Sequence, residues 1–341
     1  MFSDLGKTPY IIAEVGQNHQ GDLDLAKDFI KTFAAEGADA IKFQTRDNKT
    51  LFSQEAYEKS YDSENAFAPT YGEHRELLEL KLEWLPILKE ECEKHGVHFM
   101  STPFDEPSLS VLEDVGVDII KIASFDLGNL PFINQVGQTG KPVVISIGGG
   151  KIEQIRSSVE TLLGFHNDIA VLHCVSEYPC EFSRLGLSNI QNLISEFPDC
   201  TIGSSDHFNG ILSGPIAYMM GARVFEKHVT LNRAWRGTDH SFALEPAGFK
   251  KFVRDVKRVP KMLPLKPQDN LGEEYVFQKL GKSLIALTDI KKGEKLSLEN
   301  LSGQIFNSNH VPVRESGELI GKVAKVNIAK GSPIKRDDLA V

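Results

Sequence analysis

The first three-quarters of the chain alternates short apolar runs with amphipathic segments. Each run is nearly continuous in apolar residues and ends in polar ones, which is the pattern of a parallel strand buried on both faces. The runs are Tyr10–Val15, Ala40–Gln44, Val97–Thr102, Asp118–Ser124, Pro142–Gly148, Ile169–Val175, Cys200–Ser205 and Ala222–Val229. We therefore predict a set of parallel strands joined by helices.

The segments between these runs have the spacing of helices. Asp22–Gly37 and Glu83–Gly96 place apolar residues on one helical face and end in glycine, and a final helix is expected near Ala247–Lys257. Strand–helix alternation produces right-handed βαβ units, and eight units over about 250 residues predict a (β/α)₈ (TIM) barrel, an α/β fold. A doubly wound open sheet is the alternative, and it fits less well because no GxGxxG loop follows the first strand.

Three segments depart from this alternation. Thr45 to Lys81 separates the second strand from its helix, and a loop of that length is usually functional or disordered, so we expect it on the catalytic face of the barrel. Residues 259–279 contain prolines without helical periodicity and read as a linker that ends a barrel domain of residues 1–258. Residues 280–341 predict a small β-rich domain, in which two similar turns, KKGEKL and AKGSPI, suggest an internal duplication.

Composition narrows the classes of function. Hydrophobic residues make up 41% of the chain and charged residues 25%, as in ordinary globular proteins, and the formal net charge of -9 argues against nucleic acid as a partner. The sequence has no apolar run long enough for a membrane span and no signal-peptide pattern, so we expect no membrane association and a cytoplasmic location. The four cysteines form no CxxC pair and are expected to be free thiols.

Polar residues gather where the predicted strands end, which is where barrel enzymes place their active sites. Lys42 and Lys121 would point into an interior that normally prefers aliphatic side chains. One such lysine would be explained by an ion pair with a neighbouring glutamate, whereas two among several hydroxyl groups favour a phosphate or carboxylate site. A local positive site would also overcome the repulsion between an anionic substrate and the acidic chain.

Two histidines end neighbouring strands. His207 and His228 would converge at the mouth of the barrel, and neutral imidazoles in that position suit a divalent transition metal. Manganese, magnesium or cobalt would suit such a site, and water and substrate would fill the open positions. The other interpretation is that each histidine is a hydrogen-bonded residue at the end of its strand.

The motifs at these strand ends resemble those of N-acetylneuraminate (sialic acid) synthases and their legionaminate, pseudaminate and spore-coat relatives. The tail resembles the antifreeze-like SAF domain that follows the barrel in that family. The matching stretches are YIIAEVGQNHQGDLDLAKDFI, EGADAIKFQT, FMSTPFDEPSLSVLEDVGVDIIKIAS, LHCVSEYPC, IGSSDHFNG, ARVFEKHVTL and RGTDHSFALEP, with KSLIALTDIKKGEKLSLENL in the tail.

The resemblance implies a role for each matching residue. His207 and His228 correspond to metal ligands, and Glu14, Asp126, Tyr178 and Asp239 to residues around the metal, the sugar and the reacting carbons. Those assigned to phosphoenolpyruvate are Lys42, Gln44, Thr102, Lys121, Ser124, Ser146 and Ser205. The family further implies a homodimer in which the SAF domain of one subunit caps the barrel of its partner.

The implied activity is condensation of phosphoenolpyruvate with an amino-sugar aldehyde and water, which releases phosphate and gives a sialic-acid-type nine-carbon keto acid. One alternative is another phosphoenolpyruvate-dependent 3-deoxy keto acid synthase. Its substrates carry a second phosphate, for which the strand ends show no arginine cluster. A non-catalytic sugar-binding relative is the other alternative. Two positions depart from the family pattern: Ile147 replaces a threonine, and the SAF domain lacks the usual substrate loop.

Overall fold

The computed structural model describes residues 1–265, 274–308 and 310–340. Its contacts divide the chain into two compact units, Met1–Leu263 and Pro264–Val341. Part of the expected linker, residues 266–273, lies outside the described residues. No helix in the described ranges combines the length and apolar character that a membrane crossing requires.

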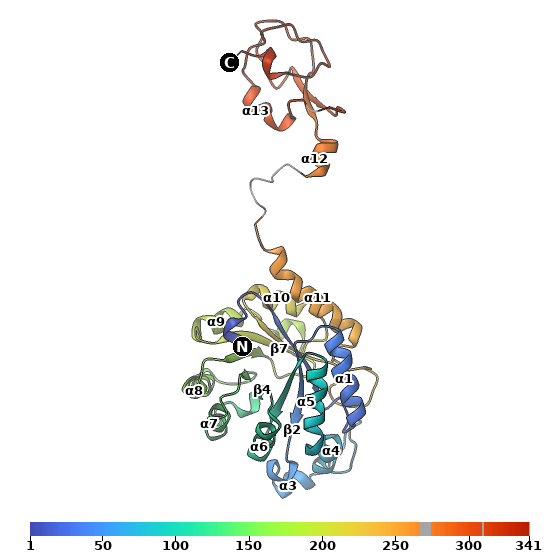
Figure 1. Cartoon of the computed structure of the whole chain (residues 1–341), viewed down its shortest axis with the longest axis vertical. Helices are drawn as coiled ribbons and strands as arrows, with labels where there is room; N and C mark the ends of the chain where they lie inside the picture. The colour runs from blue at the N-terminus through green and yellow to red at the C-terminus, as the bar shows by residue number, and fades with distance from the viewer. Residues whose placement is uncertain (266–273, 309, 341) are drawn as a thin grey trace. The chain divides into compact units, whose positions relative to one another are not determined.

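The first unit is a closed barrel of eight parallel strands, which confirms the predicted fold class and excludes the open sheet (Figure 1). Pairing of β1 with β8 closes the ring. The strands are β1 (Tyr10–Gly16), β2 (Ala40–Thr45), β3 (His98–Pro103), β4 (Ile119–Ile122), β5 (Val143–Ser146), β6 (Ile169–Cys174), β7 (Thr201–Asp206) and β8 (Val224–His228).

Helices surround the strands and cover their outward faces (Figure 1). In α1 (Leu23–Ala35), the Asp22 carboxylate caps the first turn, and Phe29 and Phe33 face the barrel. The remaining outer helices are α5 (Leu85–Lys94), α6 (Glu106–Val115), α7 (Leu130–Gln138), α8 (Ile152–Leu163), α9 (Asn189–Glu196), α10 (Ser213–Met220) and α11 (Pro246–Met262).

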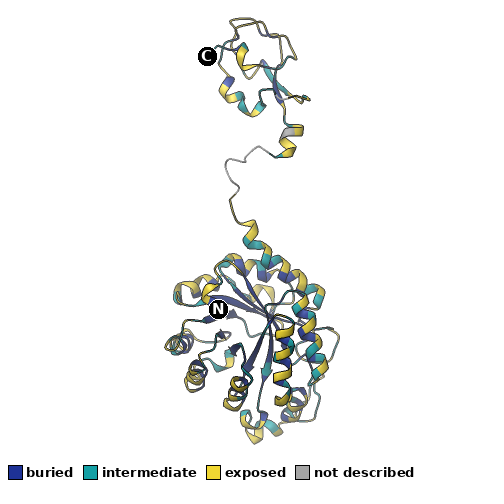
Figure 2. Ribbon diagram, viewed as in Figure 1, coloured by how far each residue is buried: buried dark blue, intermediate teal, exposed yellow. Residues whose placement is uncertain are grey.

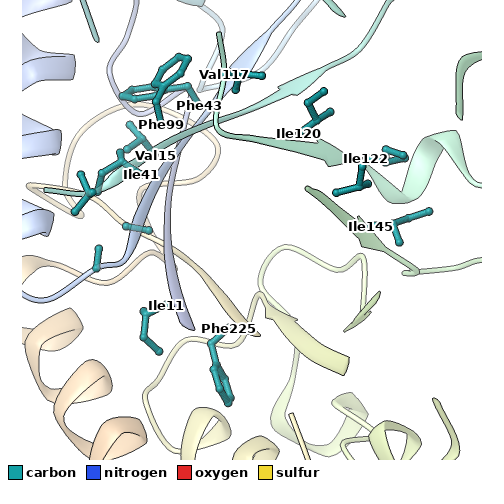
Figure 3. Packing of buried hydrophobic residues seen from close by; sticks show 14 of the residues in the cluster. Ile11, Val15, Ile41, Phe43, Phe99, Val117, Ile120, Ile122, Ile145 and Phe225 are labelled. Carbon is teal, nitrogen blue, oxygen red and sulfur yellow. The ribbon is translucent and has the colours of Figure 1, made fainter. Parts of the chain in front are cut away.

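Burial follows this layering. The barrel strands are almost entirely buried, whereas the helices around them expose one face to solvent (Figure 2). Outward-pointing strand residues such as Ile11, Ile41, Ile120 and Phe225 join the helices in one large apolar core (Figure 3). Because alternate residues of a strand point to opposite faces, the residues between them point into the barrel.

Two segments differ from the sequence-based expectation. The stretch after β2, expected as one long loop, forms three short helices whose first turns are capped by Asp47, Ser53 and Thr70. They are α2 (Asn48–Leu51), α3 (Gln54–Glu58) and α4 (Tyr71–Leu78). Helix α11 continues past residue 258 to Met262, because Val259 still packs against the barrel core.

The second unit matches the β-rich expectation. It contains α12 (Tyr275–Leu280), the antiparallel pair β9 (Ser283–Ala286) and β10 (Leu301–Gln304), and α13 (Ser316–Leu319). The run KVAKVNIA (residues 322–329) forms no regular strand and contributes only isolated bridges, such as that between Ile290 and Ile328.

Hydrogen bonds in this unit support the expected duplication. The amide of each residue in the Ile290–Ile328 bridge donates to the carbonyl of the other over 2.8 Å. Further bonds occur in pairs that a shift of 38 residues relates to each other. Ala286 N to Ser332 O corresponds to Ala324 N to Glu294 O, and Lys292 N to Asn327 Oδ1 corresponds to Lys330 N to Asp289 Oδ1. Each half therefore completes the hydrogen bonding of the other.

Candidate active site

The inward-facing residues of the barrel form an apolar layer followed, two positions later on each strand, by a polar one. Both layers are almost fully buried. The apolar layer includes Ile12, Ala40, Met100, Ile119, Val144, Leu172 and Val224. The residues two positions later are Glu14, Lys42, Thr102, Lys121, Ser146, Cys174 and Glu226. Since every second side chain of a strand points to the same face, the inner face changes from apolar to polar within about 7 Å along each strand.

The polar layer forms the floor of a cavity of about 710 Å³ at the carboxyl ends of the strands. This volume falls within the usual range for small-molecule sites. The cavity brings together nearly all the residues expected at the site: Glu14, Lys42, Gln44, Thr102, Lys121, Ser124, Ser146, Tyr178, Ser205, His207, His228 and Asp239.

Asp126 lies apart from that set. It ends a short 3₁₀ turn over Ser124–Asp126, and its carboxylate accepts a hydrogen bond from the Asn129 side-chain amide over 3.1 Å. Ser124, at the start of the same turn, does line the cavity. The turn therefore separates two residues that the sequence places together.

The two buried lysines have different partners. Lys42 Nζ lies 2.7 Å from Glu14 Oε2 and 3.7 Å from Glu226 Oε2. Lys42 therefore forms the ion pair with a neighbouring glutamate that was one of the two explanations for a buried lysine. Lys121 Nζ donates to the carbonyl oxygen of Ile122 over 3.0 Å. Burial lowers the pKa of Lys121, because it disfavours an ammonium group away from water.

The pKa values of the two carboxylates in this layer, Glu14 and Glu226, are shifted in opposite directions. Burial raises the pKa of Glu14 above its usual range, against the effect of Lys42. Burial acts in the same sense on Glu226, but Lys121 and Lys42 outweigh it and hold its pKa below the usual range. One carboxylate is thus suited to carry a proton while its neighbour stays charged, which is an arrangement typical of sites that move protons.

The histidines converge beside this floor. The ring centres of His207 and His228 lie 5.2 Å apart, and the Tyr178 ring lies 4.0 Å from that of His207, tilted by 40°. His207 Nδ1 donates to the Val175 carbonyl over 2.7 Å, which leaves its Nε2 lone pair available. His228 Nδ1 is buried without a hydrogen-bond partner among the described residues and lies 3.6 Å from an Asp239 carboxylate oxygen.

These residues fit a divalent metal that keeps open coordination positions. Burial lowers the pKa of His228, so its imidazole is neutral and can act as a ligand. Within the described residues, no group of three or more His, Cys, Asp or Glu side chains forms a ready-made metal site. Two imidazoles with an acidic neighbour are compatible with an ion that also binds water and substrate.

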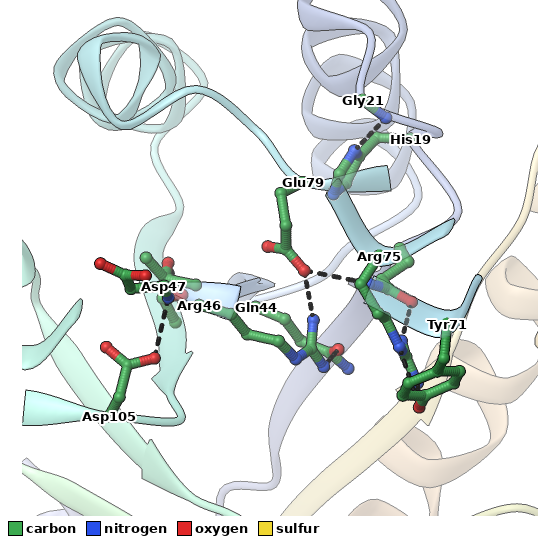
Figure 4. Close-up of polar contacts among 12 residues, drawn as sticks. His19, Gly21, Gln44, Arg46, Asp47, Tyr71, Arg75, Glu79 and Asp105 are labelled. Carbon is green, nitrogen blue, oxygen red and sulfur yellow. Dashed lines mark hydrogen bonds and ion pairs between the residues drawn. The ribbon is translucent and has the colours of Figure 1, made fainter. Parts of the chain in front are cut away.

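Two arginines that the sequence analysis missed also line the cavity. Arg46 lies just beyond β2, and Arg75 is supplied by α4 (Figure 4). Arg46 continues the alternation of Lys42 and Gln44, so the strand pattern contained a signal for it. Arg75 had no such signal, because its position depends on how the residues between β2 and α5 fold.

Comparison with known proteins identifies the family. The NeuB family matches residues 29–266, and the SAF domain matches residues 281–340. The chain is 33% identical to the N-acetylneuraminate-9-phosphate synthase of Mus musculus, with 98% of this chain and 94% of the relative covered. It is also 33% identical to the N,N'-diacetyllegionaminic acid synthase of Campylobacter jejuni, with 96% and 99% covered.

A solved structure shows the same similarity. The N-acetylneuraminic acid synthetase of Leptospira borgpetersenii superposes with a TM-score of 0.69 at 33% identity, over 80% of this chain and 92% of that one. The relatives named above are synthases of sialic-acid-type sugars, and both parts of this chain match the corresponding family models. The chain belongs to the NeuB family and carries a C-terminal SAF domain.

Proposed function

We propose that the protein condenses phosphoenolpyruvate with the open-chain aldehyde of an N-acyl amino sugar, such as N-acetylmannosamine, in a divalent-metal-dependent reaction. The product is a nine-carbon keto acid of the sialic-acid type. The observation that carries the proposal is a single cavity lined by two buried lysines, two buried histidines and several hydroxyl groups. The relatives, named as synthases of such acids, support the reaction class.

In this proposal the cavity floor holds phosphoenolpyruvate. Lys42 and Lys121 attract its phosphate and carboxylate in a protein whose overall charge repels anions. The Ser146 hydroxyl is buried without a protein hydrogen-bond partner in the described structure, so it is available to the substrate. The remaining polar contacts would come from Gln44, Thr102, Ser124 and Ser205.

His207 and His228 would hold the metal, with manganese the expected ion and magnesium or cobalt the alternatives. When bound, the ion would act as a Lewis acid toward the sugar aldehyde. Tyr178 and Asp239 lie beside the two histidines and would orient the sugar.

The reaction balances as follows. A carbon–carbon bond forms between C3 of phosphoenolpyruvate and the aldehyde carbon, and the aldehyde oxygen takes up a proton. Water adds to C2, the bond between C2 and the phosphate oxygen breaks, and phosphate leaves. We assign removal of the water proton to Glu14 rather than to Asp126, because Glu14 lies in the cavity and its raised pKa suits a proton acceptor.

The assembly proposed with this function is a homodimer in which the SAF domain of one subunit covers the barrel of the other. Aromatic residues at the cavity rim, Phe125 and Tyr178, are 77% and 48% exposed in the single chain. Such exposed apolar surface beside a site favours coverage by protein. Sedimentation of the full chain tests this assembly, and a monomer at the concentrations used for turnover would contradict it.

The test of the reaction is phosphate release from phosphoenolpyruvate. Purified protein is incubated with manganese and separately with N-acetylmannosamine, N-acetylmannosamine 6-phosphate and 2,4-diacetamido-2,4,6-trideoxyhexoses, with and without a chelator. We expect acceptor-dependent release that the chelator abolishes and that readded manganese restores. His228→Ala should reduce turnover by about a thousandfold or more, the loss expected when several kcal/mol of charge stabilisation disappear.

The matched control is His95→Ala, a partly exposed histidine paired with Glu91 on α5, which should leave turnover unchanged. Chelator-resistant turnover, or a fully active His228→Ala, would refute the metal assignment. Binding of phosphoenolpyruvate without release for any acceptor would instead support a sugar-binding relative without catalysis.

A further inference from the structure

The cavity has a second cationic part above its lysine floor. Arg46 follows Lys42 and Gln44 on the same side of the β2 segment, and its side chain is only 7% exposed. Its guanidinium pairs with Glu79 over 2.8 Å, donates to Gln44 Oε1, and lies 4.0 Å from the centre of the Phe104 ring. These contacts fix the orientation of the planar group before any ligand binds.

Arg75 approaches the same place from α4. It donates from Nε to the Tyr71 hydroxyl over 3.0 Å and from Nη1 to the Gln17 side-chain oxygen, both of which are uncharged (Figure 4). The Gln17 amide donates in turn to Glu79 Oε1 over 3.1 Å, the same oxygen that pairs with Arg46. The hydrogen-bonded cluster thus contains two guanidinium groups and one carboxylate.

This cluster is continuous with the proposed reaction site. The Gln44 amide donates to Glu14 Oε1 over 2.8 Å, and Glu14 pairs with Lys42. Gln17, Gln44, Arg46, Tyr71 and Arg75 line the same cavity as the lysines and histidines. A ligand that extends from the floor toward α4 would therefore pass from one positive group to another.

The excess of positive charge in this cluster indicates which group a ligand carries at its end near α4. A neutral hydroxylated sugar requires hydrogen bonds but no net positive charge, and a partly buried cation with neutral partners is costly. The planar donors of arginine match a phosphate group in two parallel hydrogen bonds. The phosphate of phosphoenolpyruvate already has Lys42 and Lys121, so the outer arginines call for a second anion.

We propose, building on the function above, that the acceptor is an amino-sugar phosphate whose phosphate lies at the end remote from the aldehyde and binds Arg75 and Arg46. The product then keeps that phosphate. Sequence identity does not distinguish a phosphorylated from an unphosphorylated acceptor. The relative named for a 9-phosphate product and the one named for diacetyllegionaminic acid are each 33% identical to this chain. The arginines provide the phosphate site that the strand ends lack.

Two acceptors that differ only in the phosphate test the inference. With phosphoenolpyruvate and manganese, kcat/KM for N-acetylmannosamine 6-phosphate should exceed that for N-acetylmannosamine by about a hundredfold or more, which is the effect of two charged hydrogen bonds. Mass spectrometry of the product should find the phosphate retained. This comparison uses the unmodified protein and does not depend on the folding of a variant.

Variants locate the effect. Arg75→Gln should reduce the preference for the phosphorylated acceptor by about tenfold to a hundredfold, mainly through KM, and Arg75→Lys should retain part of it because the charge remains. The matched control is Arg254→Gln, at a 46% exposed arginine on α11 that pairs with Asp255 outside the cavity, and it should leave the preference unchanged.

Two results would overturn the inference but leave the proposed function intact. The first is equal or better turnover of the unphosphorylated sugar. The second is turnover only with 2,4-diacetamido-2,4,6-trideoxyhexoses, which have no hydroxyl at carbon 6 to carry a phosphate. No release with any acceptor would overturn the proposed function and this inference together. A preference unchanged in Arg75→Gln would refute the assigned site.

Discussion

The two inner layers of the barrel lie on the same strands but differ in what they contribute. The layer toward the amino ends of the strands, which includes Ile12, Ala40 and Val144, is apolar, and Phe2 packs against it. The next layer contains the ion pair of Lys42 with Glu14 and the buried Ser146 hydroxyl, which has no hydrogen-bond partner among the described residues. Both layers are almost fully buried, so burial alone does not separate structure from function.

The two layers differ in whether their buried groups have interaction partners within the protein. An apolar layer gains stability from every contact it makes. A layer of charges and unpaired hydroxyl groups costs stability unless a ligand completes it. The difference predicts that substitutions in the first layer change folding, whereas those in the second change binding.

The largest expected effect is at Phe2, which packs against the apolar layer. Phe2→Ala should lower the free energy of unfolding of the barrel by about 3–5 kcal/mol, because Phe2 is 1% exposed and its removal leaves a cavity. Both tryptophans, Trp84 and Trp235, lie in the barrel unit, so tryptophan fluorescence in a denaturant titration reports on it. Phosphoenolpyruvate affinity without denaturant should be unchanged.

The control for this substitution is Phe182→Ala, at a side chain that is 72% exposed, and its effect should stay within about 0.5 kcal/mol. A loss of phosphoenolpyruvate affinity in folded Phe2→Ala would show that the two layers are coupled.

A reciprocal exchange on β5 sharpens the comparison. Val144→Ser should cost about 2–3 kcal/mol of stability, since it removes apolar contacts and buries a hydroxyl group. Ser146→Val, two residues later, should change stability by less than about 1 kcal/mol but raise the KM for phosphoenolpyruvate, because it removes an unpaired hydroxyl. Denaturant titration measures the stability of both variants, and steady-state kinetics measures their KM for phosphoenolpyruvate. Equal stability losses at the two positions would contradict it.

The smallest change in stability is expected for Lys121→Met. The cost of burying the ammonium group and its attraction to Glu226 act in opposite directions, so stability should shift by less than about 1 kcal/mol. Calorimetric titration with phosphoenolpyruvate should show at least about tenfold weaker binding, because a charged contact is lost. Lys250→Met, at an exposed residue that pairs with Glu36, serves as the control. A stability loss above 2 kcal/mol would mean that Lys121 is mainly a structural ion-pair partner.

Much of this organisation could be predicted from local sequence. The buried strands follow from their apolar runs, and Lys42, Lys121 and the two histidines follow from the polar ends of those runs. Period-two alternation places these residues on the inner face, and the closed ring brings their strand ends together.

The rest depends on contacts between distant segments. Arg75 reaches the cavity because α4 folds back over the barrel mouth, and nearby Asn65 accepts a hydrogen bond from the Gly237 amide, 172 residues away in the chain. Asp126 differs from Arg75 in that its contact is local: the 3₁₀ turn after β4 directs its carboxylate toward Asn129, three residues later. Neither outcome is visible in the periodicity of the surrounding residues.

The exchange of hydrogen bonds between the halves of the C-terminal unit has a consequence for how this unit unfolds. Backbone amides near Ile290 depend on acceptors near Ile328, and the reverse holds as well, so neither half satisfies its backbone alone. Opening one half removes partners from the other, which makes partial opening unfavourable. Slow amide exchange in the two halves should therefore be lost together, as in a single cooperative unit, despite the scarcity of regular strands.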